Sequence, residues 1–168
     1  NKSWNAYRLI NGWQVDASLA QSDCSKQAVA WFTNRFNAAL AEIEDNFNNY
    51  RISEALMVAY KLFWDDFSGW YLEMIKPAYG TPCDAATMEA TKHIFEQLML
   101  LLHPFMPFIT EEIWQTLPHD GDSIMVSEWP VFTDDLSFKA DEAEMERVMT
   151  AIKAVRNRRA EMNVPPSK

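Results

Sequence analysis

The stretch from Leu98 to Trp114, LMLLLHPFMPFITEEIW, constrains the fold of this chain more than any other. An apolar helix runs into Pro104, and a proline disfavours α geometry in the residue before it. Pro107 then stands where the first turn of a new helix tolerates a missing N–H group. The sequence therefore predicts a sharp, buried elbow between two helices that pack against each other or against shared neighbours.

Composition favours one helical core. The chain has 168 residues, of which 48% are hydrophobic and 13% aromatic, and this length suits a single well-buried core. Only four glycines occur and β-branched runs are few, so helices are favoured over strands. No apolar run reaches the roughly 20 residues that span a bilayer, and no signal peptide is recognisable. We therefore expect a cytoplasmic protein.

Apolar residues recur every three or four positions in several long segments, which is the pattern of helices with one buried face. We predict an all-α fold, an antiparallel helix bundle of about five helices followed by a short extended segment and a final helix. Asp23 or Ser25 can cap the second helix, and Asp84 the fourth. The expected helices span residues 1–13, 25–48, 53–76, 84–103, 107–117 and 140–162, with the extended piece at 124–129.

Charge divides the chain unevenly. The net charge is −9, and residues 84–150 carry 14 acidic but only 3 basic side chains, whereas residues 151–168 carry one acidic and five basic. Phosphates need nearby Lys or Arg, so any RNA contact must use the ends or selected faces. We expect a helical-bundle domain at 1–119, and at 120–168 the extended segment plus a basic helix, the truncated start of a further region.

The sequence contains none of the common catalytic or metal-binding motifs. It has no Gly-rich phosphate loop, no nucleophile elbow, no HExxH and no metal-spaced set of His or Cys. His93 and His103 share one predicted helix but lie roughly 15 Å apart along its axis. We therefore expect no catalytic residue, no metal ligand and no cofactor in this chain, and a structural role for His103 at the helix end.

The predicted helix at 53–76 places one apolar residue on a polar face. Leu72 falls in line with the polar side chains at 61, 65 and 68. It is either an ordinary exposed leucine or a contact to a ligand. The inward row that we predict for this helix is Leu56, Tyr60, Phe63, Phe67, Trp70 and Met74.

Basic side chains gather near both ends of the chain. Lys2 and Arg8 form a small cationic edge on the first helix. In the final helix a cluster occurs within seven residues, which is either a solvated face, a partner for acidic groups, or a contact to RNA phosphates. The members of this cluster are Lys153, Arg156, Arg158 and Arg159.

Four motifs together resemble the valyl-tRNA synthetases, a class I family. They are NKSWNA at 1–6, FWDDFSGWYLE at 63–73, LLHPFMPFITEEIW at 101–114 and VRNRRAEMNVPPSK at 155–168. The resemblance covers nearly the whole chain in the same order. The third motif is shared loosely with the isoleucine, leucine and methionine members of the class, while the first and last favour valine.

This resemblance implies an α-helical anticodon-binding domain. Such a domain binds tRNA(Val) and follows the catalytic domain, which uses ATP with Mg and whose signatures are absent here. The other partners implied are the catalytic, editing and coiled-coil parts of the same chain, in a monomeric enzyme. The alternatives are a helical protein-interaction or packing domain, and the equivalent domain of an isoleucyl- or leucyl-tRNA synthetase.

The resemblance also implies roles for single residues. Lys2 and Arg8 match family positions that contact phosphates or bases, and Leu72 and Glu73 match positions near the anticodon bases. A Glu73 carboxylate can accept a hydrogen bond from the exocyclic amino group of adenine or cytosine. Leu9 stands where related sequences often have Phe, so it offers apolar contact in place of an aromatic stack.

Overall fold

A computed structural model describes residues 2–133 and 139–165 of this chain. The chain forms two compact units, residues 1–137 and residues 138–168, and each is described by itself. The boundary that we predict after residue 119 concerns domains and not compact units, so it stays a prediction.

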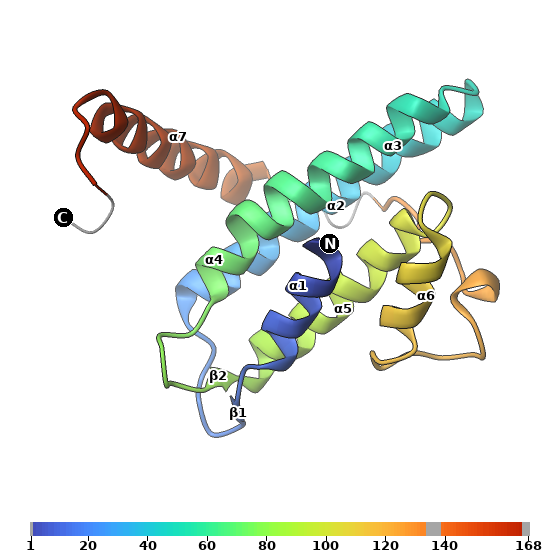
Figure 1. Ribbon diagram of the computed structural model, residues 1–168, viewed down its shortest axis with the longest axis horizontal. Helices are drawn as coiled ribbons and strands as arrows, with labels where there is room; N and C mark the ends of the chain where they lie inside the picture. Colours follow the sequence, from blue (N-terminus) through green and yellow to red (C-terminus); the bar gives the residue numbers. More distant parts are fainter. Residues whose placement is uncertain (1, 134–138, 166–168) are drawn as a thin grey trace. The chain divides into compact units, whose positions relative to one another are not determined.

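The first unit is a bundle of helices with short connections (Figure 1). Its elements are α1 (Lys2–Asn11), β1 (Val15–Asp16), α2 (Asp23–Asn48), α3 (Ile52–Lys61), the π-helix η1 (Leu62–Tyr71), α4 (Leu72–Ile75), β2 (Cys83–Asp84), α5 (Ala85–Leu102), α6 (Pro107–Trp114) and the 3-10 turn η2 (Ile124–Val126). α2 packs along the continuous helix α3–η1–α4, and α5 packs against α2, α3, α1 and α6. The predicted all-α bundle is confirmed.

Side-chain caps fix where two of the helices start. At the start of α2 the Ser22 hydroxyl accepts a 3.0 Å hydrogen bond from the Ser25 N–H. The cap is therefore Ser22, and the prediction of Asp23 or Ser25 is wrong. At the start of α5 the Asp84 carboxylate accepts from the Thr87 N–H at 2.7 Å, which confirms the cap predicted there.

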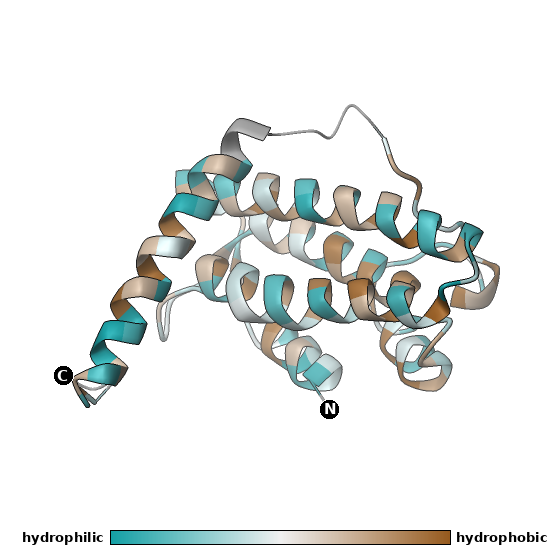
Figure 2. Ribbon diagram, turned by 90° about the horizontal axis from the view of Figure 1, so that it is seen from above, coloured by the Kyte–Doolittle hydropathy of each residue, from teal (hydrophilic) through white to brown (hydrophobic). Residues whose placement is uncertain are grey.

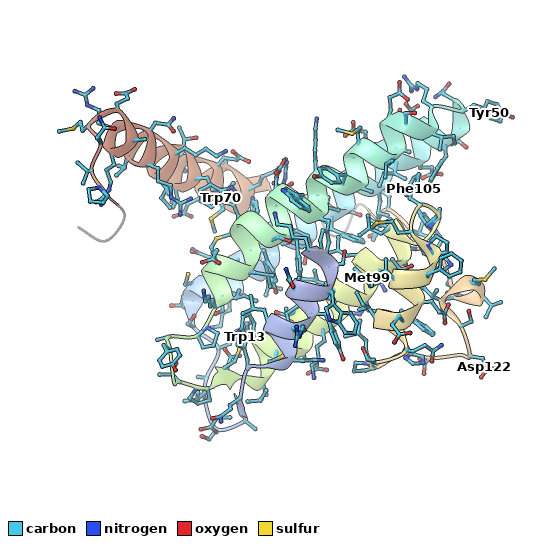
Figure 3. The ribbon with its side chains drawn as sticks, viewed as in Figure 1. Trp13, Tyr50, Trp70, Met99, Phe105 and Asp122 are labelled. Atoms are coloured by element: carbon cyan, nitrogen blue, oxygen red, sulfur yellow. The ribbon has the colours of Figure 1, made fainter. Side chains whose placement is uncertain are left out.

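A tight turn at Tyr50 reverses the chain between α2 and α3 (Figure 3). The Arg51 N–H donates to the Asn46 carbonyl at 2.8 Å, and the Tyr50 N–H donates to the Phe47 carbonyl at 3.0 Å. This pair of bonds is a Schellman motif, and it places Tyr50 in the left-handed region at φ 57°. The turn lets α3 return antiparallel along α2.

A short parallel strand pair, which sequence patterns did not predict, ties α1 to the rest of the bundle. β1 pairs with β2 in the register Val15 to Cys83 and Asp16 to Asp84. The Cys83 N–H also donates to the Gln14 carbonyl at 2.7 Å. Because β2 leads directly into α5, these bonds hold the segment after α1 beside the start of α5.

The core is organised around Phe67, which lies in η1. Its ring centroid lies 5.4 Å from Phe32 of α2, 5.6 Å from Phe95 of α5 and 5.5 Å from Tyr71. All four side chains are fully buried. Aromatic pairs at these separations add to the stabilisation that burial gives. One cluster therefore joins three helices.

The π-helical hydrogen bonding of η1 changes which residues of this long helix face the core. The buried positions leading into it are Ala55 and Ala59 of α3, and Leu62 at its start. A straight α-helix continued from these residues would bring positions 66 and 73, an Asp and a Glu, to the inside. The wider i to i+5 turn shifts the register, and the aromatic and aliphatic residues at 67, 71 and 75 are buried in their place.

The predicted inward row of this helix is therefore wrong in part. Phe63 and Phe67 are buried as predicted, but Leu56 and Tyr60 are exposed. The last two members of the row, at 70 and 74, are only half-buried. The small alanines before η1 let the helix approach α2 closely, and the register shift then displaces the inward row after it.

The elbow between α5 and α6 forms where the prolines predict it. The Met106 N–H donates to the Leu102 carbonyl at 3.0 Å, and Pro107 occupies the first turn of α6. The corner itself lies at the surface, because both prolines are exposed and Phe108 is 91% exposed. The prediction of a buried corner is wrong, since the buried side chains belong to the helices on either side of it.

His103 closes the elbow through a side chain. Its Nδ1 lies 2.8 Å from the Thr110 hydroxyl, which in turn donates to the Met106 carbonyl at 2.8 Å. The predicted structural role of His103 is confirmed, although its partner is a hydroxyl and not a free carbonyl of the helix end. The bond links His103, the residue that follows α5, to Thr110 of α6.

The segment after α6 returns to α2. Its part at 124–126 is the turn η2, so the extended geometry predicted there is wrong over these residues. At its far end Asn37 of α2 donates to the Thr133 carbonyl at 2.7 Å and accepts from the Thr133 N–H at 3.0 Å. Asn37 is buried, so this reciprocal pair anchors the segment.

The second unit contains α7 (Lys139–Glu161), which confirms the predicted final helix. Figure 2 shows hydrophilic and hydrophobic stretches interspersed along its ribbon. None of the described helices is both long and apolar enough to cross a membrane.

Glu111 of α6 fastens the loop that precedes η2. Its carboxylate accepts from the Gln115 side-chain amide at 2.8 Å and from the Ser123 hydroxyl at 2.9 Å. The bond from Gln115, helped by the bond from Ser123, lowers the pKa of the Glu111 carboxyl below its usual value.

We expect Glu111→Gln to lower the free energy of unfolding at pH 7 by roughly 1 kcal/mol. A pKa that is lower in the folded state stabilises above the unfolded pKa of about 4.3, and this contribution is lost as the pH falls through the folded value. The gap to the wild type in urea unfolding should therefore shrink at acidic pH. Glu112→Gln, at the exposed neighbouring position, is the control. A gap that is constant with pH would contradict the role of the charge.

Candidate nucleic-acid interface

α1 presents a cationic edge. Its inward side is formed by Ser3, Ala6 and Ile10, which are buried. Arg8 is exposed and its neighbour Leu9 is half-buried, so both reach the surface. The helical period thus separates a face that packs on the bundle from a face that carries the predicted contacts.

Lys2 is held against η1. Its ammonium lies 3.6 Å from the ring centroid of Trp64 and donates to the Trp64 carbonyl at 3.3 Å. A cation over a tryptophan face is attracted by the ring quadrupole. The start of α1 and the beginning of η1, which are 62 residues apart in sequence, therefore meet at one place on the surface.

Trp64 also stacks on Tyr60, one helical turn earlier. The two ring centroids are 5.3 Å apart and the planes differ by 14°. Tyr60 is 44% exposed and Trp64 38% exposed, so this stack is open to solvent. Sequence patterns missed it because Tyr60 had been assigned to the core. The spacing of the two aromatics at i and i+4 was the signal that could have revealed the pair.

Leu72 lies inside the bundle and Glu73 outside it. Leu72 is only 3% exposed, so its predicted place on an exposed polar face is wrong, and the register shift in η1 is the reason. Glu73 is exposed, and its carboxylate lies 3.9 Å from the Lys76 ammonium. The roles of Leu72 and Glu73 near a base stay predictions.

The structure brings Lys2 into contact with η1, but it shows no direct contact between the predicted residues of α1 and the predicted pair Leu72 and Glu73. In the described part of the chain, no hydrogen bond or ion pair links α1 to Leu72 or Glu73. Between Trp64 and Glu73 stands Gly69, which is exposed and follows Trp64 by one π turn. Because Gly69 has no side chain, nothing projects from the helix at this point.

The basic cluster of α7 remains at the surface. Lys153, Arg156 and Arg158 are exposed, and Arg159 is half-buried. Arg158 pairs with Glu161 at 2.9 Å, and Arg159 donates to the Pro165 carbonyl at 2.9 Å. Exposed pairs of this kind are weak, so the arginines can exchange them for phosphate contacts.

A groove elsewhere on the first unit holds no set of side chains arranged for catalysis. It runs between α2 and α3, has a volume of about 520 Å³, and its walls carry charges of both signs. Arg35 and Asp66 bridge it at 3.2 Å. Among the residues that the structure describes, no group of three His, Cys, Asp or Glu side chains is placed to hold a metal ion.

Comparisons with known proteins identify the family of this chain. Residues 29–168 match the family described as the anticodon-binding domain of tRNA ligase. The chain is 49% identical to a valine–tRNA ligase of Parabacteroides distasonis over 167 residues, and 50% identical to one of Porphyromonas gingivalis over 168, in each case over 98% of this chain. A valine–tRNA ligase of Bacillus thuringiensis is 42% identical over the whole chain.

The chain covers only part of these proteins. It spans 19% of the length of the first two relatives and 20% of the third. Their similarity to this chain therefore concerns about a fifth of each ligase.

The burial of Leu72 predicts a structural effect. We expect Leu72→Ala to lower the free energy of unfolding by about 2–5 kcal/mol, because it removes a buried side chain and leaves a cavity. The matched control is Leu19→Ala at an exposed position, which should change stability by less than about 0.5 kcal/mol. Equal urea midpoints for the two variants would show that Leu72 is not buried.

Proposed function

Because this chain belongs to the family of anticodon-binding domains of tRNA ligases, we propose that it is the anticodon-recognition domain of a valine–tRNA ligase. The whole enzyme attaches valine to tRNA(Val), and this part binds and positions the tRNA without contributing a catalytic group. The observation that carries the proposal is the similarity of 98% of the chain to valine–tRNA ligases.

The proposal includes the parts of the ligase that lie outside this sequence. ATP with Mg serves the catalytic domain, and this chain needs no cofactor of its own. Besides tRNA(Val), the partners are the catalytic, editing and coiled-coil parts of the same ligase. The ligase acts as a monomer in the cytoplasm.

The anticodon loop binds at the surface where α1 meets η1. Lys2 and Arg8 supply positive charge for phosphates or base edges at this place, and Leu9 adds an apolar contact. The exposed Glu73 carboxylate accepts from an exocyclic amino group of adenine or cytosine. Leu72, which is buried, fixes the position of Glu73 from beneath.

The basic cluster of α7 contacts the tRNA backbone. Lys153, Arg156, Arg158 and Arg159 lie close together on one helix, and each phosphate that they neutralise releases counterions. Such contacts position the tRNA without selecting a base. The acidic side chains within residues 84–150 repel phosphates, so they restrict the RNA to the basic surfaces.

A second candidate function is a helical protein-interaction domain. It is favoured by exposed apolar side chains on α6 and on η2, two elements that pack together. They are Phe108, Met125 and Val126. The equivalent domain of an isoleucyl- or leucyl-tRNA synthetase would bind a different tRNA, so a tRNA binding assay separates all three possibilities.

We expect the chain to bind tRNA(Val) transcripts weakly, with an affinity that falls as the salt concentration rises. Exchange of the middle or third anticodon base should reduce the affinity, because the base edges are read directly. Filter binding at several salt concentrations measures both effects. Indifference to both base changes would contradict anticodon recognition, and preference for an isoleucine or leucine tRNA would reassign the substrate.

Two substitutions separate base contacts from phosphate contacts. Glu73→Ala should relax the preference among anticodon bases by about 1–3 kcal/mol. Lys2→Ala should weaken the binding of all tRNAs alike. It should also reduce the dependence of the affinity on salt concentration by about the amount that one phosphate contact contributes. If both variants changed base preference equally, this division of roles would be wrong.

A further inference from the structure

Among the stacked aromatic pairs that the structure describes, Tyr60 and Trp64 are the pair in which both side chains are exposed. The aromatic residues around Phe67 have no exposed surface, whereas Tyr60 and Trp64 keep 44% and 38%. Their rings are nearly parallel, with planes 14° apart. A flat, solvent-facing aromatic surface of this kind can receive a further planar ring.

The surroundings of the pair point to a nucleic-acid partner. The Lys2 ammonium lies 3.6 Å from the Trp64 ring centroid, so a positive charge borders the flat surface. Single-stranded nucleic acid is bound by just this combination, aromatic faces for the bases and cations for the backbone.

We infer that Tyr60 and Trp64 form a platform on which one unpaired base of the tRNA anticodon loop stacks. This rests on the proposed function and adds to it a binding site that the family resemblance does not assign. The base approaches the exposed ring surface, and the Lys2 ammonium leaves the indole for a neighbouring phosphate. The cation–π contact of the free protein thus keeps the lysine close to where the backbone will lie.

The platform takes a different base from the one that Glu73 contacts. Trp64 and Glu73 are nine positions apart in the sequence, which corresponds to roughly 13 Å along a helix. Both are exposed, and Gly69 between them carries no side chain that would obstruct a strand of RNA. One base can therefore stack at Trp64 while another meets the Glu73 carboxylate.

Leucine substitutions test the platform. We expect Tyr60→Leu and Trp64→Leu each to weaken binding of the tRNA(Val) transcript about tenfold, because base stacking on an aromatic ring is lost. The salt slope should stay unchanged, since neither side chain neutralises a phosphate. The matched control is Tyr79→Leu, because Tyr79 is fully exposed and lies outside the proposed platform. This variant should bind the transcript as the wild type does. Equal thermal melting curves show that each variant is folded.

Abasic RNA identifies the stacked base. Each loop nucleotide of the transcript is replaced in turn by an abasic one, and each RNA is bound to the wild type and to Trp64→Leu. At one position the abasic change should weaken RNA binding by the wild type about tenfold but leave RNA binding by Trp64→Leu nearly unchanged. The reason is that the abasic change and the substitution remove the same contact.

The outcomes distinguish the platform from the function on which it rests. If the wild type binds tRNA(Val) with anticodon preference, but both leucine variants match it and no abasic position is coupled to Trp64, the platform is overturned and the proposed function stands. That result would make the exposed pair a protein-packing surface. If the wild type binds no tRNA, or ignores the anticodon, the proposed function fails and the platform fails with it.

Discussion

The contact of Phe67 with Phe32 and Phe95 is the interaction on which the rest of the bundle depends. It joins η1, α2 and α5 in one buried cluster, with ring centroids 5.4 and 5.6 Å apart. To bring Phe67 and the positions after it inward, the long helix must change from α to π geometry at Leu62. Burial of large aromatic surface outweighs the poorer hydrogen-bond geometry of the π-helix.

This change of register also determines the surface that we propose for tRNA binding. It turns Leu72 into the bundle and leaves Trp64 and Glu73 outside. The strand pair β1–β2 holds the chain after α1 beside α5, and Lys2 closes the other end of α1 against Trp64. Packing in the core thus brings a cationic group and an aromatic group that are 62 residues apart in sequence into contact at the surface.

Charge restricts where RNA can bind. A chain with a net charge of −9 is an unfavourable partner for phosphates as a whole, and the basic side chains of α1 and α7 are the local exceptions. In the function that we propose, few cations face the anticodon, so specificity comes from short-range contacts such as the Glu73 carboxylate and aromatic stacking. The proposed backbone contacts from α7 add affinity without changing which base is preferred.

The sequence by itself determined the all-α class, the approximate positions of the long helices and which family the chain resembles. Caps such as Asp84, the prolines at 104 and 107 and the apolar period are local signals, and they act over a few residues. It did not determine that Tyr60 is exposed or Leu72 buried, since two neighbouring rows of the helix were both apolar enough to face the core. Tertiary structure decided between them, because the register depends on Phe32 and Phe95, which lie about thirty residues away in sequence on either side of η1. The strand pair was hidden for the same reason, since each strand has two residues and exists only when its distant partner is in place.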